Sequence, residues 1–241
     1  MKTTDYILYT IDRLPKGYVF TYTDFINEVK KKEAVIKALN RMATSGKITK
    51  LAKGKFYKPE TSVFGTLQPQ QYQIVKDLLE VDGKTIGYLT GYSLYNQLGL
   101  TRQISNTIQI GKNEVRTAFK REHFTISFIK QKNTITKENI PLLQILDSIR
   151  YIKKIPDASI SSSCTRLLSI LEELPGKDKS TIIRLAIKYP PSTRALLGAL
   201  LEEIEGAFFA STLQNTLNPI TKYKISEVDK VLSSAKKWNI V

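Results

Sequence analysis

Three polar side chains within the segment 33–58 have the types and the spacing that can contact the edges of base pairs. Lys37, Asn40 and Arg41 share one face of a helical pattern, and the opposite face carries an apolar stripe at helical spacing, Val35, Ala38, Leu39 and Met42. An arginine can make two hydrogen bonds to a guanine, and an asparagine can make two to an adenine. We therefore take Lys37, Asn40 and Arg41 as candidates for base contacts in the major groove of DNA.

A basic hairpin is predicted directly after this helix. Gly46 can adopt the left-handed conformation that closes a helix. Two short strands over 47–52 and 55–58 follow, joined by the turn Lys53-Gly54. Lysines on such a hairpin would contact the DNA backbone or lie in the adjacent minor groove. The lysines to which we assign this role are Lys50, Lys53 and Lys55.

Hydroxyl side chains gather at the start of an earlier short helix. Thr21 is placed to cap this helix, which the pattern predicts over 22–29. Hydroxyl groups and free backbone N–H groups at the start of a helix can bind phosphate. We assign phosphate contacts to Thr21, Tyr22 and Thr23.

The elements that must position these side chains occur in the order of a winged helix-turn-helix. The pattern predicts a helix over 4–14, a short strand over 18–20, the helix over 22–29 and a basic turn at 30–32, before the helix and the hairpin described above. In a helix-turn-helix the second helix of the motif lies in the major groove. The sequence thus predicts a DNA-binding domain over residues 1–60.

The rest of the chain is predicted to form an α+β domain over 61–160 with a small sheet, and a helical bundle over 161–241. Residues 61–68 are predicted to be a linker, and Pro69 suits the first position of a helix. Strands are predicted over 84–88, 107–110 and 124–129. Further helices are expected after the caps Thr90, Ser192 and Ser226, over 91–98, 193–205 and as far as Trp238. The fold class predicted for the whole chain is α+β.

The net charge of the chain is +15, and it is unevenly distributed. Residues 1–60 carry 13 Lys and Arg against 6 Asp and Glu, residues 61–155 carry 13 against 7, and residues 156–241 carry 11 against 9. A basic balance of this size favours an anionic partner, either nucleic acid or a membrane surface. General solubility would explain the total charge but not its concentration toward the N-terminus.

Composition excludes several other classes of protein. The single cysteine, Cys164, rules out an internal disulfide and a cysteine-based zinc site. No apolar run reaches the roughly 18 residues of a membrane helix, and the N-terminus lacks the apolar centre of a signal peptide. We therefore expect a soluble cytoplasmic protein with no membrane partner.

Catalytic signals are weak. Gly83-Lys84-Thr85 matches the end of a phosphate-binding P-loop, but that motif needs a glycine where Leu78 stands. His123 is the only histidine, and neither it nor Cys164 belongs to a nucleophile motif. Both residues are expected to be structural. The sequence predicts no enzyme, no catalytic residues, no cofactor and no metal site.

The segment 87–101 is rich in glycine and tyrosine. Gly87 and Gly91 bracket a step from strand to helix, where close approach of the backbone is needed. The tyrosines of this segment are either core residues with a polar tip or a surface that meets a partner. The sequence leaves both interpretations open for Tyr88, Tyr92 and Tyr95.

Three groups of short motifs follow one another along the chain. They are AVIKAL at 34–39 with GKI at 46–48 and GKFYKP at 54–59, then GYLTG at 87–91 with LGLT at 98–101, then LDSI at 146–149 with IPD at 155–157. In this order they resemble the AbiEi-type antitoxin family of bacterial type IV toxin–antitoxin systems. The resemblance covers residues 1–160, and the later helices are similar to a C-terminal extension in one branch of such proteins.

The resemblance implies a DNA-binding autorepressor with a second role. It implies that the winged helix binds inverted repeats of operator DNA upstream of its own operon. It also implies that the following domain counters a nucleotidyltransferase toxin encoded by the neighbouring gene, usually without a stable complex. The alternative is a winged-helix protein whose basic face binds RNA or a protein partner, with no antitoxin role.

Overall fold

The computed structural model describes residues 3–26, 29, 31–63 and 65–241, which form two compact units. The first unit comprises residues 1–78 with 120–124, and the second comprises 79–119 with 125–241. Both helices and sheets are present, so the fold is mixed α+β. The structure groups most of the expected middle domain with the expected C-terminal bundle.

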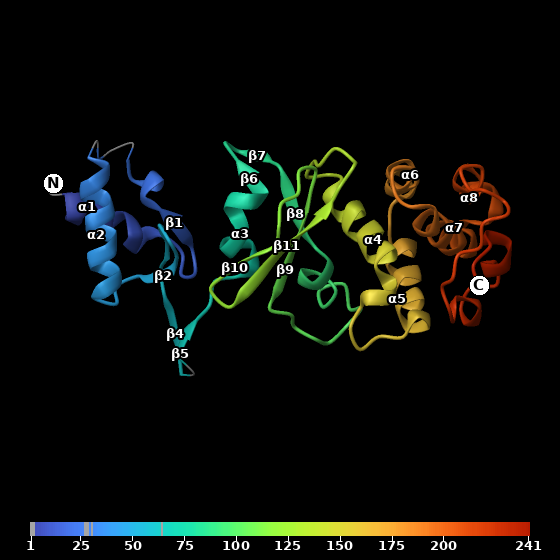
Figure 1. Cartoon of the computed structure of the whole chain (residues 1–241), viewed down its shortest axis with the longest axis horizontal. Coiled ribbons are helices and arrows are strands. Elements are labelled where there is room, and N and C mark those ends of the chain that lie inside the picture. Colours follow the sequence, from blue (N-terminus) through green and yellow to red (C-terminus); the bar gives the residue numbers. More distant parts are fainter. Residues whose placement is uncertain (1–2, 27–28, 30, 64) are drawn as a thin grey trace. The chain divides into compact units, whose positions relative to one another are not determined.

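The first unit combines helices with a three-stranded antiparallel sheet. Its helical segments are α1 (Thr3–Arg13), the 3-10 helix η1 (Tyr22–Asp24) and α2 (Lys32–Thr44). The strands β1 (Val19–Thr21), β2 (Thr49–Ala52) and β3 (Lys55–Tyr57) pair in the order β1-β3-β2. Helices α1 and α2 pack against each other (Figure 1). Their apolar stripes bury Ile7, Ile11, Val35 and Leu39 beside Phe20 and Phe56 of the sheet.

Two predictions for the first unit are changed in part by the structure. The helix predicted over 22–29 begins with the 3-10 turn η1, and the N–H of Val29 donates to the carbonyl of Phe25 at 3.2 Å, while residues 27, 28 and 30 lie outside the described residues. The linker predicted over 61–68 contains the hairpin β4 (Glu60–Ser62) and β5 (Gly65–Leu67), which projects from the unit in Figure 1. Helix α3 (Gln71–Leu79) then begins two residues after Pro69.

A mixed four-stranded sheet has the order β10-β11-β9-β8. Its strands are β8 (Gly87–Thr90), β9 (Thr107–Lys112), β10 (Phe119–Arg121) and β11 (Phe124–Lys130). Strand β11 runs parallel to β9, whereas β8 runs antiparallel to it. A small ladder of β6 (Glu80–Val81) and β7 (Lys84–Thr85) precedes this sheet and encloses the predicted turn Asp82-Gly83.

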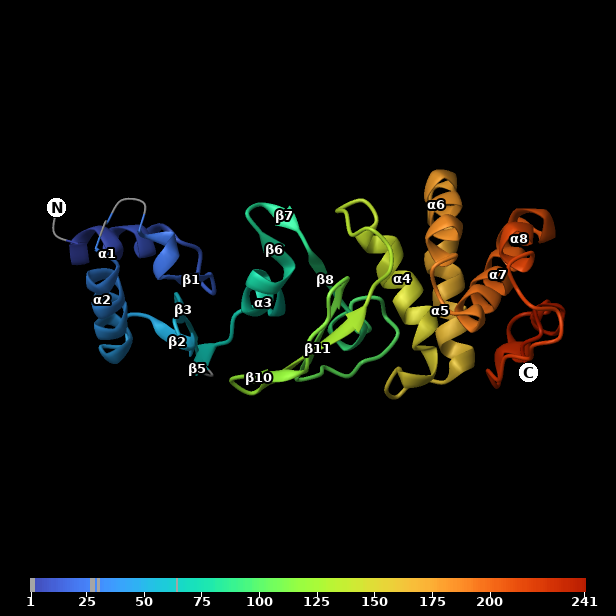
Figure 2. The ribbon, with the colours of Figure 1, turned by 45° about the horizontal axis from the view of Figure 1, so that its top comes forward.

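Helices make up the remainder of the second unit. They are α4 (Ile140–Arg150), α5 (Ile160–Glu172), α6 (Gly176–Ala186), α7 (Pro191–Glu205) and α8 (Ala207–Gln214). Within this unit, α4 is the helix beside the sheet, and α7 and α8 are farthest from it (Figure 2). One apolar core runs from Tyr88 to Ile240. The boundary expected at residue 160 therefore does not divide the core.

Three predicted helix starts in the second unit need correction. Thr90 stands at the N-cap position, but it precedes the 3-10 turn η2 (Gly91–Ser93), and its side chain makes no capping hydrogen bond because its hydroxyl donates to Asp147. Pro190, not Ser192, is the cap of α7. After Ser226 the chain forms two 3-10 turns, η4 (Val228–Lys230) and η5 (Ala235–Trp238), in place of one helix.

No helix in the described part of the chain is long and apolar enough to span a membrane.

Candidate nucleic-acid interface

Helix α2 separates its apolar and polar residues onto opposite faces. The four predicted core residues are at most 7% exposed, Val35, Ala38, Leu39 and Met42. Lys37, Asn40 and Arg41 are all exposed. The periodicity in the sequence therefore identified the inner face of this helix correctly, and it leaves a polar face with two cations and an amide accessible to a ligand.

The end of α2 leads directly into the β2–β3 hairpin. Gly46 has a positive φ of 74°, and the backbone N–H of Lys47 donates to the carbonyl of Met42 at 3.0 Å. This arrangement satisfies a carbonyl at the helix end and turns the chain into the hairpin. Gly54 also has a positive φ at the hairpin turn. Lys50 and Lys53 are exposed, while Leu51 between them is buried.

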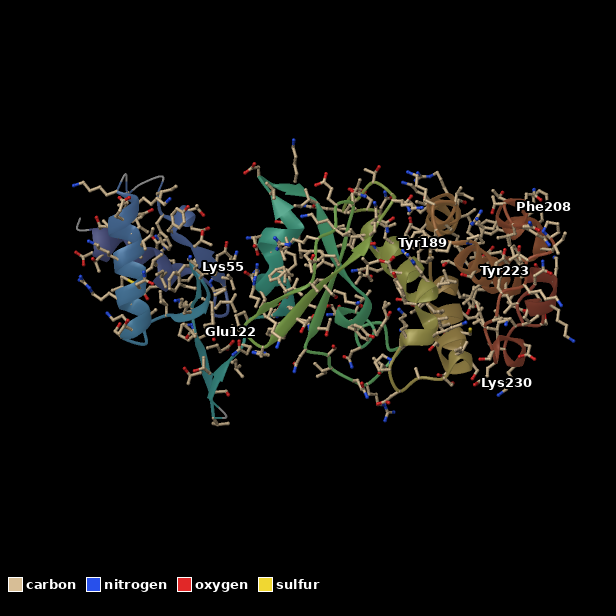
Figure 3. All side chains as sticks on the ribbon, viewed as in Figure 1. Lys55, Glu122, Tyr189, Phe208, Tyr223 and Lys230 are labelled. Carbon is tan, nitrogen blue, oxygen red and sulfur yellow. The ribbon has the colours of Figure 1, made fainter. Side chains whose placement is uncertain are left out.

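Lys55 has a different role from the other two lysines of the hairpin. Its ammonium nitrogen lies 2.9 Å from Asp77 Oδ2, and Arg121 contacts the same carboxylate at 2.8 Å and 3.1 Å. Burial disfavours the charged form of Asp77, but the hydrogen bonds from Arg121 and Lys55 outweigh this and hold its pKa below the ordinary value. Lys55 is thus engaged in an ion pair in the first unit, where Figure 3 labels it.

The predicted phosphate contacts at Thr21, Tyr22 and Thr23 are only partly compatible with the structure. The backbone N–H of Thr21 donates to Asp24 Oδ2 at 2.7 Å, and the N–H of Thr23 donates to the Thr21 hydroxyl at 3.2 Å. These donors complete a capping box, so the backbone groups that we expected to be free are occupied. The Lys32 ammonium lies 4.8 Å from the centre of the Tyr22 ring.

The tyrosines of the segment 87–101 belong mainly to the core. Tyr88 is 2% exposed and Tyr95 is 1% exposed, and Tyr92 is half-buried with its ring 5.9 Å from that of Tyr95. The interpretation as a partner surface is therefore wrong for Tyr88 and Tyr95, because buried side chains cannot reach a partner. Tyr88 instead donates a hydrogen bond to Asp147 at 2.7 Å.

Asp147 is the centre of a buried polar network that links the sheet to the helices. Besides the Tyr88 bond, its carboxylate accepts hydrogen bonds from the hydroxyls of Thr90 and Tyr189, each at 2.8 Å. Gln131 donates to the hydroxyl oxygens of both tyrosines, at 2.8 Å and 2.7 Å. Burial raises the pKa of Asp147 above its ordinary value. This network supports the fold, and all of its named members have partners.

The residues considered for catalysis belong to different elements of the chain. Lys84 and Thr85 form strand β7, and His123 is exposed with its ring 4.0 Å from that of Phe124. Cys164 is fully buried, and burial raises its pKa to about 11. Among the described residues, no group of three or more His, Cys, Asp or Glu side chains is arranged to hold a metal ion.

Comparison with known proteins places the chain in a family. The model of a family of unknown function (DUF6088) matches residues 6–172, which is more than half of the sequence. The chain belongs to this family. The crystal structure of the RV2827C protein from Mycobacterium tuberculosis is similar, with a TM-score of 0.62 and 11% sequence identity over 92% of this chain and 83% of that chain. At this identity the likeness concerns the fold alone. No curated protein matches the sequence.

Proposed function

We propose that the first unit of this DUF6088 protein is a winged helix-turn-helix that binds double-stranded DNA. The observation that carries the proposal is the exposed face of α2, where Lys37, Asn40 and Arg41 stand opposite a fully packed apolar face. From Ala34 to its end, α2 contains no acidic residue. A helix with this face can enter the major groove without repulsion from the phosphates.

The β2–β3 hairpin supports the same docking. It follows α2 after the Gly46 turn and presents Lys50 and Lys53 to solvent. In the proposed complex the hairpin is the wing, and these lysines contact phosphates beside the groove that α2 occupies. Lys55 keeps the wing in place through Asp77 and does not contact DNA.

The second part of the proposal concerns the rest of the chain. The DNA-binding unit acts as an autorepressor on inverted repeats upstream of its own operon, and the second unit counters a nucleotidyltransferase toxin encoded next to it. This part is supported by the order of motifs that resembles the AbiEi-type antitoxins. The large second unit is also consistent with a role that DNA binding does not require.

The test of the DNA-binding role is binding of the full chain to the DNA upstream of its gene. The affinity should fall steeply with salt, because the lysines displace counterions from the phosphates. Replacing Arg41 by alanine should weaken specific binding by about 1–3 kcal/mol and relax the sequence preference. The matched control is Arg184→Ala, which removes an exposed arginine from α6 in the second unit.

The outcomes separate the proposal from its alternative. Unchanged operator binding by Arg41→Ala would show that the assigned docking face is wrong. Tighter binding to RNA than to operator DNA would favour the RNA-binding alternative. For the antitoxin role, co-expression with the product of the neighbouring gene should restore growth, and loss of that rescue on deletion of the second unit would assign the activity to it.

A further inference from the structure

A basic cavity lies in the second unit, which contains none of the residues assigned to DNA. Its volume is about 480 Å³, and it lies among the end of α4, the 3-10 turn η3 (Ile152–Lys154), the start of α7 and residues 222–225. Five cationic side chains line it, Arg150, Lys153, Lys154, Lys222 and Lys224. No Asp or Glu is among the described residues that line this cavity. An unbalanced positive wall of this kind attracts anions.

The positive wall extends into a second cavity of about 290 Å³. The two cavities share Arg150 and Pro190, and the second is also lined by Lys130, Lys132 and Lys188. It too has no acidic residue among its described lining residues. Tyr189 lines the second cavity and Tyr223 lines the first, and Figure 3 shows both tyrosines among the helices of this unit.

The first cavity also receives the N-terminus of a long helix. Helix α7 has 15 residues and begins Pro191-Ser192-Thr193, and both Ser192 and Thr193 line the cavity. Pro191 has no N–H, so Ser192 carries the first N–H group of the helix. The N-terminus of such a helix carries a partial positive charge and favours an anion beside it.

Two buried hydroxyl groups in the wall of the cavity lack hydrogen-bond partners. The side chains of Thr193 and Tyr223 are 2% and 6% exposed, and neither Thr193 Oγ1 nor the Tyr223 hydroxyl has a partner among the described residues. Buried polar groups are normally paired, and an unpaired one destabilises a fold. Both oxygens are covered in the ligand-free structure, so a small rotation of each side chain would be needed to pair its hydroxyl with an acceptor that enters the cavity.

The backbone around Tyr223 is held firmly. Its N–H donates to the carbonyl of Asn239 at 2.7 Å, and its carbonyl accepts from the N–H of Val241 at 2.9 Å. Lys222 and Lys224 on either side are exposed, and the Lys153 ammonium group donates to the carbonyl of Lys224. The wall that carries these cations is thus attached to the turn after α4 and to the last residues of the chain.

We propose that this cavity binds a phosphate group. The hydroxyls of Thr193 and Tyr223 and the N–H of Ser192 would donate to its oxygens, and Arg150 and Lys224 would balance its charge. A phosphate accepts several hydrogen bonds and carries more negative charge than a single carboxylate. A phosphate therefore balances the five cationic side chains of the cavity better than a carboxylate would. The phosphate belongs either to a free nucleotide or to the backbone of a nucleic acid. The proposal does not depend on DNA binding by the first unit.

The experiment is calorimetric titration of the full chain at constant ionic strength with three probes. They are inorganic phosphate, ATP and a 12-nucleotide single-stranded DNA of random sequence. Thr193→Val removes the hydroxyl and keeps the shape of the side chain, and Lys224→Gln removes one charge. Each should weaken binding by about tenfold, the effect of losing one hydrogen bond or contact to a charged group. The control is Lys177→Gln, on an exposed lysine of α6 that lines neither cavity.

Thermal melting distinguishes a ligand site from a purely structural role. Because the Thr193 hydroxyl has no partner, ligand-free Thr193→Val should melt no lower than the wild-type chain, while its stabilisation by saturating ligand should be reduced. A lower melting temperature of the ligand-free variant would mean that the hydroxyl supports the fold, and it would overturn the proposal.

The three probes identify the source of the phosphate. If Thr193→Val weakens the binding of inorganic phosphate and ATP, the site takes a nucleotide or free phosphate. If Thr193→Val weakens the binding of the oligonucleotide alone, the site takes the backbone of a nucleic acid. Oligonucleotide bound only by the first unit would be unaffected by Thr193→Val. The proposal fails if no probe binds in a Thr193-dependent manner, or if Lys177→Gln weakens binding as much as Lys224→Gln does.

Discussion

The ammonium group of Lys55 lies 2.9 Å from the carboxylate of Asp77, and this ion pair connects the β2–β3 hairpin to α3. Arg121 contacts the other oxygen of the same carboxylate at 2.8 Å. One carboxylate thus joins three segments of the first unit that are far apart in sequence. Because of this ion pair, Lys55 supports the fold, whereas Lys50 and Lys53 are exposed on the same hairpin.

Asp77→Asn should destabilise the chain by about 1–3 kcal/mol at pH 7. This lies between the free-energy cost of losing an exposed ion pair and that of breaking a buried one. The cause is that the Arg121 guanidinium, which is 7% exposed, would lose its ion pair with the Asp77 carboxylate. Urea denaturation measures the effect, with Asp82→Asn in the exposed β6–β7 turn as the control. An Asp77→Asn variant as stable as the control would show that the ion pair contributes nothing.

The effect of Asp77→Asn should also depend on pH. The folded-state pKa of Asp77 is lowered, so its stabilisation is complete above the ordinary aspartate pKa of about 3.9 and is lost as the pH falls through the lowered value. Wild type and variant should therefore approach the same stability in acid. A difference that persists unchanged at low pH would mean that the charge of Asp77 is not its cause.

Lys53→Ala should weaken DNA binding with little effect on stability, whereas Lys55→Ala should lower stability with little effect on the salt dependence of DNA binding. Lys53→Ala should weaken binding to operator and unrelated DNA alike. The slope of the logarithm of affinity against the logarithm of salt concentration should fall by about one, because one counterion fewer is released on binding. Lys55→Ala should lower stability by about 1 kcal/mol and leave the salt dependence of binding nearly unchanged. Anisotropy titrations over a range of salt concentrations and urea denaturation measure the two effects. Equal salt dependences for the two variants would contradict the assignment.

Asp147→Asn should change how stability depends on pH. Burial raises the pKa of Asp147 in the folded state, so its ionisation costs stability as the pH rises from about 3.9 toward the raised value. Asparagine cannot ionise, so the variant should gain stability relative to the wild type across this range. Chemical denaturation between pH 4 and pH 8 tests it, with Asp229→Asn as an exposed control. A constant difference would show that Asp147 does not titrate there.

The sequence predicted local features well because their signals are local. The burial of Val35, Leu39 and Met42 follows from helical periodicity, and the positive φ of Gly46 follows from its place after the helix. The capping role of Thr21 was also correct, since Asp24 stands at the spacing of a capping box. These features depend on neighbours within a few residues, and a single sequence contains that information.

The failures involve partners that are distant in sequence. From the sequence alone, Lys55 looks like a free lysine of the hairpin, but the fold places Asp77 and Arg121 beside it. Thr90 likewise looks like a helix cap, but its hydroxyl donates to Asp147. The Thr193 and Tyr223 hydroxyls become notable only when the fold buries both in one cavity wall. Tertiary contacts override local preference in each case.

Gly198→Ala should destabilise the second unit although alanine is the better helix former. A Cβ at Gly198 in α7 would lie 2.2 Å from the Trp238 ring, which is 1% exposed and donates through Nε1 to Glu202 at 2.8 Å. The overlap should cost about 1–3 kcal/mol, more than the gain in helix propensity of about 1 kcal/mol. Gly176→Ala is the control, because nothing lies within 4 Å of its Cβ position. Thermal melting should show a lower melting temperature for Gly198→Ala alone, and tryptophan fluorescence should show an altered environment of Trp238 in that variant alone. If Gly198→Ala is as stable as Gly176→Ala, Trp238 can move aside without loss of stability.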